Sequence, residues 1–180
     1  MRQILGLSGS LREGSFNTAL LHAARDLHPQ LLHIGSIIDI PLYDADLEAA
    51  EFPSVVEALQ QEVAAADGVL LASPEYNNSV PGVLKNAIDW LSRPSPQIRN
   101  VFRDKPVAVI GASPGGFGTV SAQAAWLPVW RTLGARHWAG GRLLVSRAHE
   151  VFAETGELTD PDLRERLQTF VSGFAAFCEG

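Results

Sequence analysis

Cysteine is nearly absent from this sequence: Cys178 is the only one among 180 residues. A lone cysteine excludes a disulfide within the chain and any metal site built from several cysteines. Cys178 also continues the apolar face of Phe170, Phe174 and Phe177, which is the setting of a packed side chain and not of a nucleophile. We therefore expect neither metal nor nucleophilic chemistry from cysteine.

Long apolar runs are absent as well. No uninterrupted apolar stretch comes near the roughly 18 residues that a membrane-spanning helix needs. The first residues, Met1-Arg2-Gln3, lead into an apolar segment that is too short for a signal peptide, and no small-residue cleavage site follows it. The sequence therefore predicts a soluble, cytoplasmic protein with no membrane partner.

Basic residues are scarce: 14 Lys and Arg stand against 20 Asp and Glu, a formal net charge of -6. A general nucleic-acid surface needs clustered Lys and Arg, so no nucleic-acid partner is expected. The five histidines show no metal-ligand spacing and no geometry of an acid–base triad. We therefore expect no metal and no catalytic side chain of these kinds.

What the sequence does contain is an alternation of apolar strands with amphipathic helices. Pro41 and Pro53 bound a surface connection, and Asp160 and Pro161 are the expected N-cap and first residue of the last helix. Pro128 lies inside a helical segment, which it should break or kink. Strands are expected over residues 2–7, 30–39, 68–73, 106–112 and 136–145, and helices over 18–27, 53–66, 80–91, 118–133 and 160–177.

This alternation predicts an α/β fold. Strand and helix follow each other five times, which indicates a parallel sheet with helices on both faces, and 180 residues suit one domain spanning 1–180. Sheets of this type bind ligands at the carboxyl ends of their strands, beside the switch in strand order. Three unusual loops follow strands: SGSLREGSFN at 8–17, SPEYNNSVPG at 73–82 and SPGGFG at 113–118.

The first loop has the features of a phosphate site. Gly9 and Gly14 permit a tight backbone whose amides converge at the N-terminus of the next helix, among several hydroxyl side chains. Arg12 adds a cation for a charge-assisted hydrogen bond. The structural alternative is a capped glycine-rich turn, with Asn17 as the N-cap and Arg12 solvated. The position after the first strand favours the phosphate interpretation.

The type of phosphate compound follows from the glycine spacing. Neither the G-x-G-x-x-G pattern of dinucleotide sites nor the G-x-x-x-x-G-K-[ST] pattern of P-loops is present. Asp39 is in the place of a ribose-binding acid, but with the wrong glycines a solvated carboxylate is the better interpretation. A loop dominated by hydroxyls is typical of flavodoxin-like mononucleotide sites, so a dinucleotide-binding dehydrogenase is disfavoured.

The second and third loops suit a flat heterocycle. Tyr76 offers an aromatic face, and the amides of its loop can donate to ring nitrogens and oxygens. The alternative is a simple turn restrained by Pro74 and Pro81, with Asn77 or Asn78 in the left-handed conformation. The glycines of the third loop permit close backbone approach to a ligand, although a plain strand-to-helix connection explains them equally well.

The segments GSLREGSFN and SPEYNNSVPGVLKNAIDWLSRP resemble the NADPH-dependent FMN reductase family, particularly its chromate and quinone reductase branch. The resemblance implies a flavodoxin-like, three-layer fold with a five-stranded parallel sheet of order 2-1-3-4-5. It implies an FMN-dependent NAD(P)H oxidoreductase whose chemistry is carried by FMN, with no catalytic side chain. NADPH or NADH would be the donor, and a quinone, chromate, an azo compound or a nitro compound the acceptor.

The same resemblance assigns cofactor-binding residues. Backbone amides of Tyr76 and Asn77 would orient the ring, and amides near Gly115 and Gly116 would stabilise negative charge on its pyrimidine side. The first loop would hold the FMN phosphate, and the other two loops would border the isoalloxazine ring. The assigned residues are Ser10, Arg12, Ser15, Phe16 and Asn17 in the first loop, Pro74, Glu75, Tyr76 and Asn77 in the second, and Ser113, Gly115 and Gly116 in the third.

Oligomeric state and two alternative functions complete the expectations. Trp90, with Leu84, Ile88 and Leu91, lies on a helix that resembles the family's dimer helix, so we expect a homodimer or a homotetramer. The alternatives are a flavodoxin-type electron carrier that docks redox partners, and a non-redox binding module on the same fold. Arg93, Arg99 and Arg103 are candidates for the phosphates of a nicotinamide dinucleotide, but solvated surface charges are the favoured interpretation.

Overall fold

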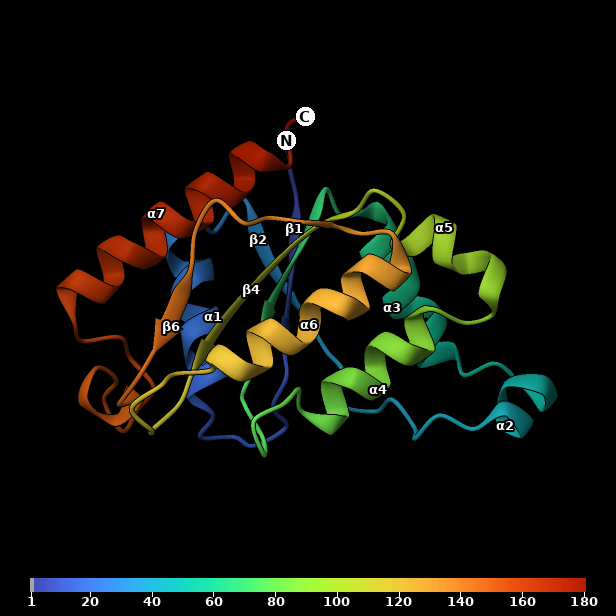
Figure 1. Cartoon of the computed structure of the whole chain (residues 1–180), viewed down its shortest axis with the longest axis horizontal. Coiled ribbons are helices and arrows are strands. Elements are labelled where there is room, and N and C mark those ends of the chain that lie inside the picture. Colours follow the sequence, from blue (N-terminus) through green and yellow to red (C-terminus); the bar gives the residue numbers. More distant parts are fainter. Residues whose placement is uncertain (1) are drawn as a thin grey trace.

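The structure is a computed structural model that describes residues 2–180, and its centre is one sheet of six strands (Figure 1). The main strand order is β2-β1-β3-β4-β5 and every pairing is parallel, which confirms the expected 2-1-3-4-5 order and the α/β class. The strands are β1 (Ile4–Ser8), β2 (Leu32–Gly35), β3 (Gly68–Ala72), β4 (Pro106–Ala112), β5 (Arg136–His137) and β6 (Leu143–Val145).

Two predicted strands differ from the structure. The single strand expected over 136–145 is two short strands: β5 pairs with the start of β4, and β6 pairs with its end. The chain leaves the sheet at Trp138, whose ring packs edge-on against Phe170, and a Cβ on Gly140 would meet that ring at 2.5 Å. The sheet therefore has six strands and not five. The second strand is much shorter than 30–39, because its pairing with β1 ends at Gly35.

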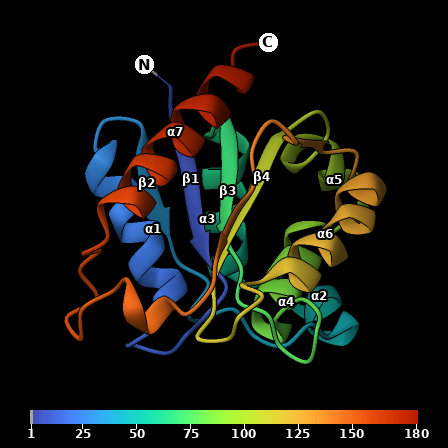
Figure 2. The same ribbon diagram turned by 60° about the vertical axis from the view of Figure 1, so that its left-hand side comes forward.

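The helices form a layer on each face of the sheet, as expected (Figure 2). Helices α1 and α7 bury their apolar faces in one core cluster, while α3, α4, α5 and α6 bury theirs in the other. Successive residues of β1 alternate between the two clusters, as Ile4 and Leu5 do, because side chains along a strand point to opposite faces. The helices are α1 (Phe16–Leu27), α2 (Ala45–Ala50), α3 (Ser54–Ala65), α4 (Gly82–Leu91), α5 (Ile98–Val101), α6 (Val120–Leu133) and α7 (Pro161–Phe177).

The ends of the helices test several local expectations. Asp160 caps α7, accepting a 2.6 Å hydrogen bond from the Leu163 backbone N–H, as predicted. Helix α1 begins earlier than expected and its N-cap is Ser15. Of the two effects expected of Pro128, a break or a kink, the break does not occur, because α6 continues through it as one helix. The tryptophans on either side of Pro128 fix this helix to the core: Trp126 and Trp130 are buried and stacked with their centroids 5.1 Å apart.

The apolar residues that suggested a dimer helix lie inside this chain. Trp90 is fully buried, and its indole N–H donates to the Pro41 carbonyl at 2.8 Å. Leu84, Ile88 and Leu91 are buried in the core cluster that α3, α4, α5 and α6 share. These side chains are therefore unavailable to a partner. Within residues 2–180 no helix has the length and apolar character needed to span a membrane.

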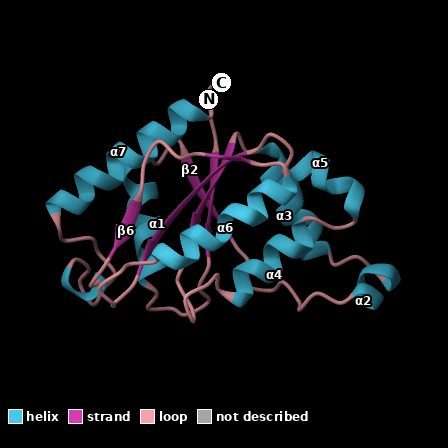
Figure 3. Ribbon diagram, viewed as in Figure 1, coloured by secondary structure: helices cyan, strands magenta, loops and turns pink. Residues whose placement is uncertain are grey.

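The connections that follow β1, β3 and β4 all lie at one end of the sheet. Figures 1 and 2 show them together at the lower end, opposite the chain termini, and Figure 3 shows that this end is built from loops. This is the carboxyl edge of the parallel strands, where α/β sheets bind ligands. The fold thus brings together the three loops that the sequence singled out.

Candidate functional site

The first loop passes directly against the second. A Cβ on Gly9 would come within 2.8 Å of Pro74 and 2.9 Å of Leu84, so only glycine allows this close approach. At the end of the loop, the Ser15 hydroxyl caps α1 by accepting from the Thr18 backbone N–H at 3.3 Å. The loop is therefore held at both of its ends.

Asn17 ties the first loop to the third strand-end loop. Its side chain is buried, with its Nδ2 donating to the Ala112 carbonyl at 2.8 Å and its Oδ1 accepting from the Ala112 N–H at 2.9 Å. The alternative with Asn17 as N-cap is therefore wrong. The Asn17 side chain is instead a brace between α1 and β4. Because both of its polar atoms are used, Asn17 can bind a ligand through its backbone N–H.

The N-terminus of α1 carries unused hydrogen-bond donors. Within residues 2–180, the backbone N–H groups of Phe16 and Asn17 make no hydrogen bond. Across the same residues, no carboxylate forms an ion pair with Arg12, whose guanidinium lies 6.0 Å from the centre of the Phe16 ring. Free amides at the positive end of a helix, beside a free cation, form an anion site.

The second loop is a tight turn. Tyr76 and Ser79 exchange backbone hydrogen bonds of 3.1 and 3.0 Å, and Asn77 and Asn78 have φ angles of 52° and 60°. Both asparagines are therefore left-handed, a conformation that asparagine tolerates better than most residues. The Tyr76 side chain is 50% exposed, so the turn presents its aromatic ring at the surface.

Residues 73–75, which lead into this turn, are fixed to α6. The Ser73 hydroxyl accepts from the Trp126 indole N–H at 2.9 Å, and Glu75 Oε2 accepts from the backbone N–H groups of Ser121 and Ala122 at 2.7 and 3.0 Å. Sequence reasoning missed this role of Glu75. The partners are more than forty positions away, so no local motif signals them.

The third loop is anchored at its start and open at its centre. Arg147 N–H donates to the Gly115 carbonyl at 3.0 Å, and the Gly115 N–H donates to the Ser113 hydroxyl at 2.9 Å. A Cβ on Gly116 would meet no atom within 4 Å, and Phe117 is 84% exposed. The loop therefore carries an exposed aromatic side chain.

These loops enclose a cavity of about 330 Å³. All the predicted cofactor-binding residues line it except Asn77, Gly115 and Gly116, and it also includes Ala112 and Pro114, which sequence reasoning missed. Ala112 is the last residue of β4 and Pro114 lies in the loop after it, so their position at a strand end could have identified them from the sequence. The lining residues are Ser10, Arg12, Ser15, Phe16, Asn17, Pro74, Glu75, Tyr76, Ala112, Ser113 and Pro114.

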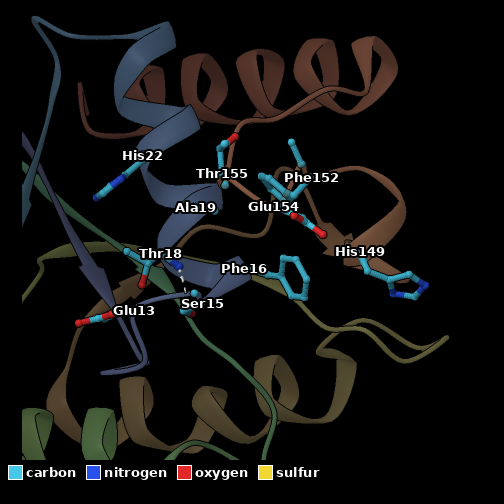
Figure 4. A pocket seen from close by; sticks show the side chains of 13 residues that line it. Glu13, Ser15, Phe16, Thr18, Ala19, His22, His149, Phe152, Glu154 and Thr155 are labelled. Atoms are coloured by element: carbon cyan, nitrogen blue, oxygen red, sulfur yellow. Dashed lines mark hydrogen bonds between the residues drawn. The ribbon is translucent and has the colours of Figure 1, made fainter.

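A larger cavity of about 540 Å³ is lined by the end of the first loop and the first turns of α1 (Figure 4). The two cavities share Ser15 and Phe16, and the dashed line in Figure 4 marks the cap between Ser15 and Thr18. Glu13 and Glu154 line the larger cavity, and no Lys or Arg does. Two carboxylates with no Lys or Arg in the same lining disfavour a phosphate compound, so the smaller cavity, which Arg12 lines, is the candidate site.

Residues outside the cavity have structural explanations. Arg93 Nε donates to Glu48 at 2.8 Å, and this partner lowers the pKa of the Glu48 carboxyl. Burial raises the pKa of the Cys178 thiol to about 11, which is unsuited to a nucleophile. Within residues 2–180 no group of three or more His, Cys, Asp or Glu side chains is arranged to hold a metal.

The donor set of the smaller cavity fits FMN. One end supplies the free amides of Phe16 and Asn17, serine hydroxyls and the Arg12 guanidinium, which together suit a terminal phosphate. The other end supplies a turn with an exposed aromatic ring and a glycine-rich loop, which suit a flat heterocycle. Fold and cavity together define a flavodoxin-like mononucleotide-binding protein.

Comparison with known proteins agrees with this class. The model of the NADPH-dependent FMN reductase family matches residues 2–150. An NAD(P)H-dependent FMN reductase of Pseudomonas aeruginosa is 43% identical over 168 residues, which cover 92% of this chain and 89% of the relative. A quinone reductase of Escherichia coli is 38% identical over 186 residues, covering 98% and 95%.

A solved structure gives the same result. FerB of Paracoccus denitrificans, a flavoenzyme NAD(P)H:(acceptor) oxidoreductase, superposes with a TM-score of 0.89 at 35% identity, covering 99% of this chain and 98% of FerB. The chain therefore belongs to the NADPH-dependent FMN reductase family. It is an oxidoreductase with FMN as cofactor and NAD(P)H as electron donor, which confirms the interpretation drawn from the sequence.

Proposed function

We propose that this chain oxidises NAD(P)H and reduces a quinone at the cavity of about 330 Å³, as one domain spanning residues 1–180. The observation that carries the proposal is the convergence of three loops, from three different strand ends, on one cavity with a free cation at one end. When bound, FMN supplies the redox chemistry, accepting a hydride from NAD(P)H and passing two electrons to the acceptor.

The first loop holds the phosphate in this proposal. Arg12 neutralises its charge, while the N–H groups of Phe16 and Asn17 donate to its oxygens. The hydroxyls of Ser10 and Ser15 lie in the same cavity wall. Asn17 contributes a second effect through its side chain, because its bonds to Ala112 keep the phosphate end and the third loop at a fixed separation.

The second and third loops orient the ring. The Tyr76 N–H already donates to the Ser79 carbonyl and the Gly115 N–H to the Ser113 hydroxyl, which corrects the expectation that these two amides serve the ring. In this proposal the Asn77 N–H would orient one edge of the ring, and the Gly116 N–H would favour negative charge on the pyrimidine side. No side chain is needed as acid or base. The half-exposed Tyr76 and the exposed Phe117 leave this part of the site open, so NAD(P)H and the acceptor use it in turn.

A quinone is the acceptor that the relatives favour. The Escherichia coli relative is named a quinone reductase, and FerB is named an oxidoreductase for an unspecified acceptor. The exposed rings of Tyr76 and Phe117 suit a flat, apolar acceptor. Chromate is a poorer match, because an oxyanion gains nothing from such a rim.

We place the protein in the cytoplasm as a homodimer or homotetramer. Trp90 and its neighbours are buried and do not supply the interface. The exposed apolar surface lies elsewhere: Leu42 is 83% exposed, and Leu47 on α2 is also exposed. Sedimentation of the purified protein tests the assembly, and a monomer at micromolar concentration contradicts it.

Steady-state kinetics test the proposed reaction. NADPH oxidation is followed while NADPH and a benzoquinone are varied, and alternating use of one site predicts parallel lines in double-reciprocal plots. A flavodoxin-type carrier would oxidise NADPH only through a partner protein. Intersecting lines, or no turnover with any quinone, contradict the proposal.

A further inference from the structure

We propose that Glu75 is a positioning residue: its carboxylate caps α6 from a distant part of the chain and so fixes the Tyr76–Ser79 turn against the third loop. This inference rests on the proposed function, because the ring of FMN is what the turn orients. The sequence assigned Glu75 only as a neighbour of the ring. Here Glu75 also holds the turn in place through its hydrogen bonds to α6.

Helix α6 lacks a cap of its own. Its N-cap residue, Thr119, makes no side-chain capping bond, although the first N–H groups of any helix need partners. Glu75 Oε2 supplies them by accepting from Ser121 and Ala122 at 2.7 and 3.0 Å. A carboxylate is the favoured partner at this end, because the helix N-terminus carries partial positive charge.

The carboxylate has no other counter-charge. Within residues 2–180, no Lys, Arg or His side chain forms an ion pair with Glu75. The positive end of the 14-residue α6 therefore balances it. Glu75 also lines the proposed FMN cavity. The contact between its carboxylate and the N-terminus of α6 therefore sets both the position and the charge of this part of the cavity wall.

The segment before the turn is held from both sides. Ser73 and Glu75 both bond to α6, and Pro74 between them packs so near the first loop that a Cβ on Gly9 would meet it at 2.8 Å. Tyr76 follows immediately. Loss of the Glu75 hydrogen bonds therefore frees the turn at its first residue, Tyr76, whereas the bond from Trp126 to Ser73 still holds the end of β3 in place.

Two substitutions separate geometry from charge. In Glu75→Gln an amide oxygen can still accept from α6, so FMN affinity stays within about twofold of wild type while the negative charge is lost. Glu75→Ala removes both, so the FMN dissociation constant rises roughly five- to tenfold, the equivalent of one lost N-cap. Glu154→Gln, an exposed carboxylate at the other cavity, is the matched control for charge loss.

The midpoint potential of bound FMN distinguishes this role from a purely structural one. Removing a negative charge beside the cavity favours uptake of electrons, so the potential moves in the positive direction in both Glu75 variants and stays unchanged in Glu154→Gln. Equal potentials in wild type and Glu75→Gln overturn the charge part of the proposal. Unchanged FMN affinity in Glu75→Ala overturns the positioning part.

Amide hydrogen exchange of the flavin-free protein gives a readout independent of FMN. Exchange at Ser121 and Ala122 becomes faster in Glu75→Ala and stays near wild type in Glu75→Gln. Unchanged exchange in Glu75→Ala contradicts the cap. If wild type itself binds no FMN, the proposed function fails while this result still judges the cap, so the two failures are distinguishable. If Glu75→Ala does not fold, Glu75→Ser, a polar residue too short to reach α6, takes its place, and unchanged exchange and FMN affinity in that variant overturn the positioning part.

Discussion

Both polar atoms of the Asn17 side chain bind the backbone of one residue, Ala112, at 2.8 and 2.9 Å. The pair joins the first turn of α1 to the last residue of β4 across a separation of 95 residues. Both residues are buried, so an unpaired backbone group left at Ala112 costs free energy. The start of α1 and the third loop are thereby fixed relative to each other.

Replacing Asn17 tests this brace. Asn17→Ala leaves the buried N–H and carbonyl of Ala112 unpaired and should lower the free energy of unfolding by about 2 to 4 kcal/mol. Urea denaturation of the flavin-free protein measures it. Asn100→Ala, at an exposed helix position, is the control and should change the stability by less than about 0.5 kcal/mol. Similar losses in the two variants contradict the brace.

Arg12 is the second test, because it is the cation assigned to the FMN phosphate. Arg12→Ala removes a charge-assisted bond and should raise the FMN dissociation constant about ten- to a hundredfold. Riboflavin, which has no phosphate, should bind wild type and variant equally. Arg25→Ala, which breaks an exposed pair with Asp26, is the control. Equal losses for FMN and riboflavin would remove Arg12 from the phosphate site.

Much of the fold followed from sequence pattern. Nearly continuous apolar runs such as residues 106–112 identify buried parallel strands, and the alternation with helices determines the layers. The predicted limits of strands and helices were wrong where contacts between residues distant in the sequence determine them. Packing of Trp138 on Phe170 divides the last strand, and burial of Trp126 and Trp130 keeps α6 continuous through Pro128.

The site was predictable in location but not in its internal bonds. Glycines, serines and Arg12 identified the three loops, because strand ends meet at one edge of the sheet. The braces within that edge, from Asn17 to Ala112 and from Glu75 to α6, join residues far apart in the chain. Spacing in a sequence carries no signal for such pairs. A polar residue beside a loop is equally consistent with ligand binding and with support of the loop.

The elevated pKa of Cys178 gives a third test. At a pKa of about 11 the thiolate is a minute fraction at pH 8, so iodoacetamide should alkylate the folded protein on the order of a hundredfold more slowly than the urea-unfolded chain. Cys178→Ser should keep full turnover. Rapid alkylation of the folded protein, or a large loss of turnover in Cys178→Ser, contradicts the structural role of this residue.

His137 gives a test by pH. Burial lowers the pKa of its imidazole, and among residues 2–180 its Nδ1 finds no hydrogen-bond partner. Below an unfolded pKa of about 6.5 the unfolded chain therefore binds more protons than the folded one, so stability falls as pH decreases through this range.

His137→Gln should flatten this dependence between pH 7 and 5, measured by urea denaturation at each pH. His33→Gln, on the exposed side of β2, should leave the dependence as in wild type. If the free energy of unfolding changes with pH in His137→Gln as it does in wild type, other groups cause the pH dependence.

Anaerobic spectroscopy of the FMN-loaded protein shows whether bound flavin carries electrons from NAD(P)H to a quinone. NADPH, and then NADH in a separate sample, is added while the visible flavin absorbance is recorded, and a benzoquinone follows. We expect rapid bleaching by a reduced nicotinamide cofactor and rapid recovery on adding the quinone. Absorbance that persists after both donors, or that bleaches and is not restored by the quinone, would contradict it.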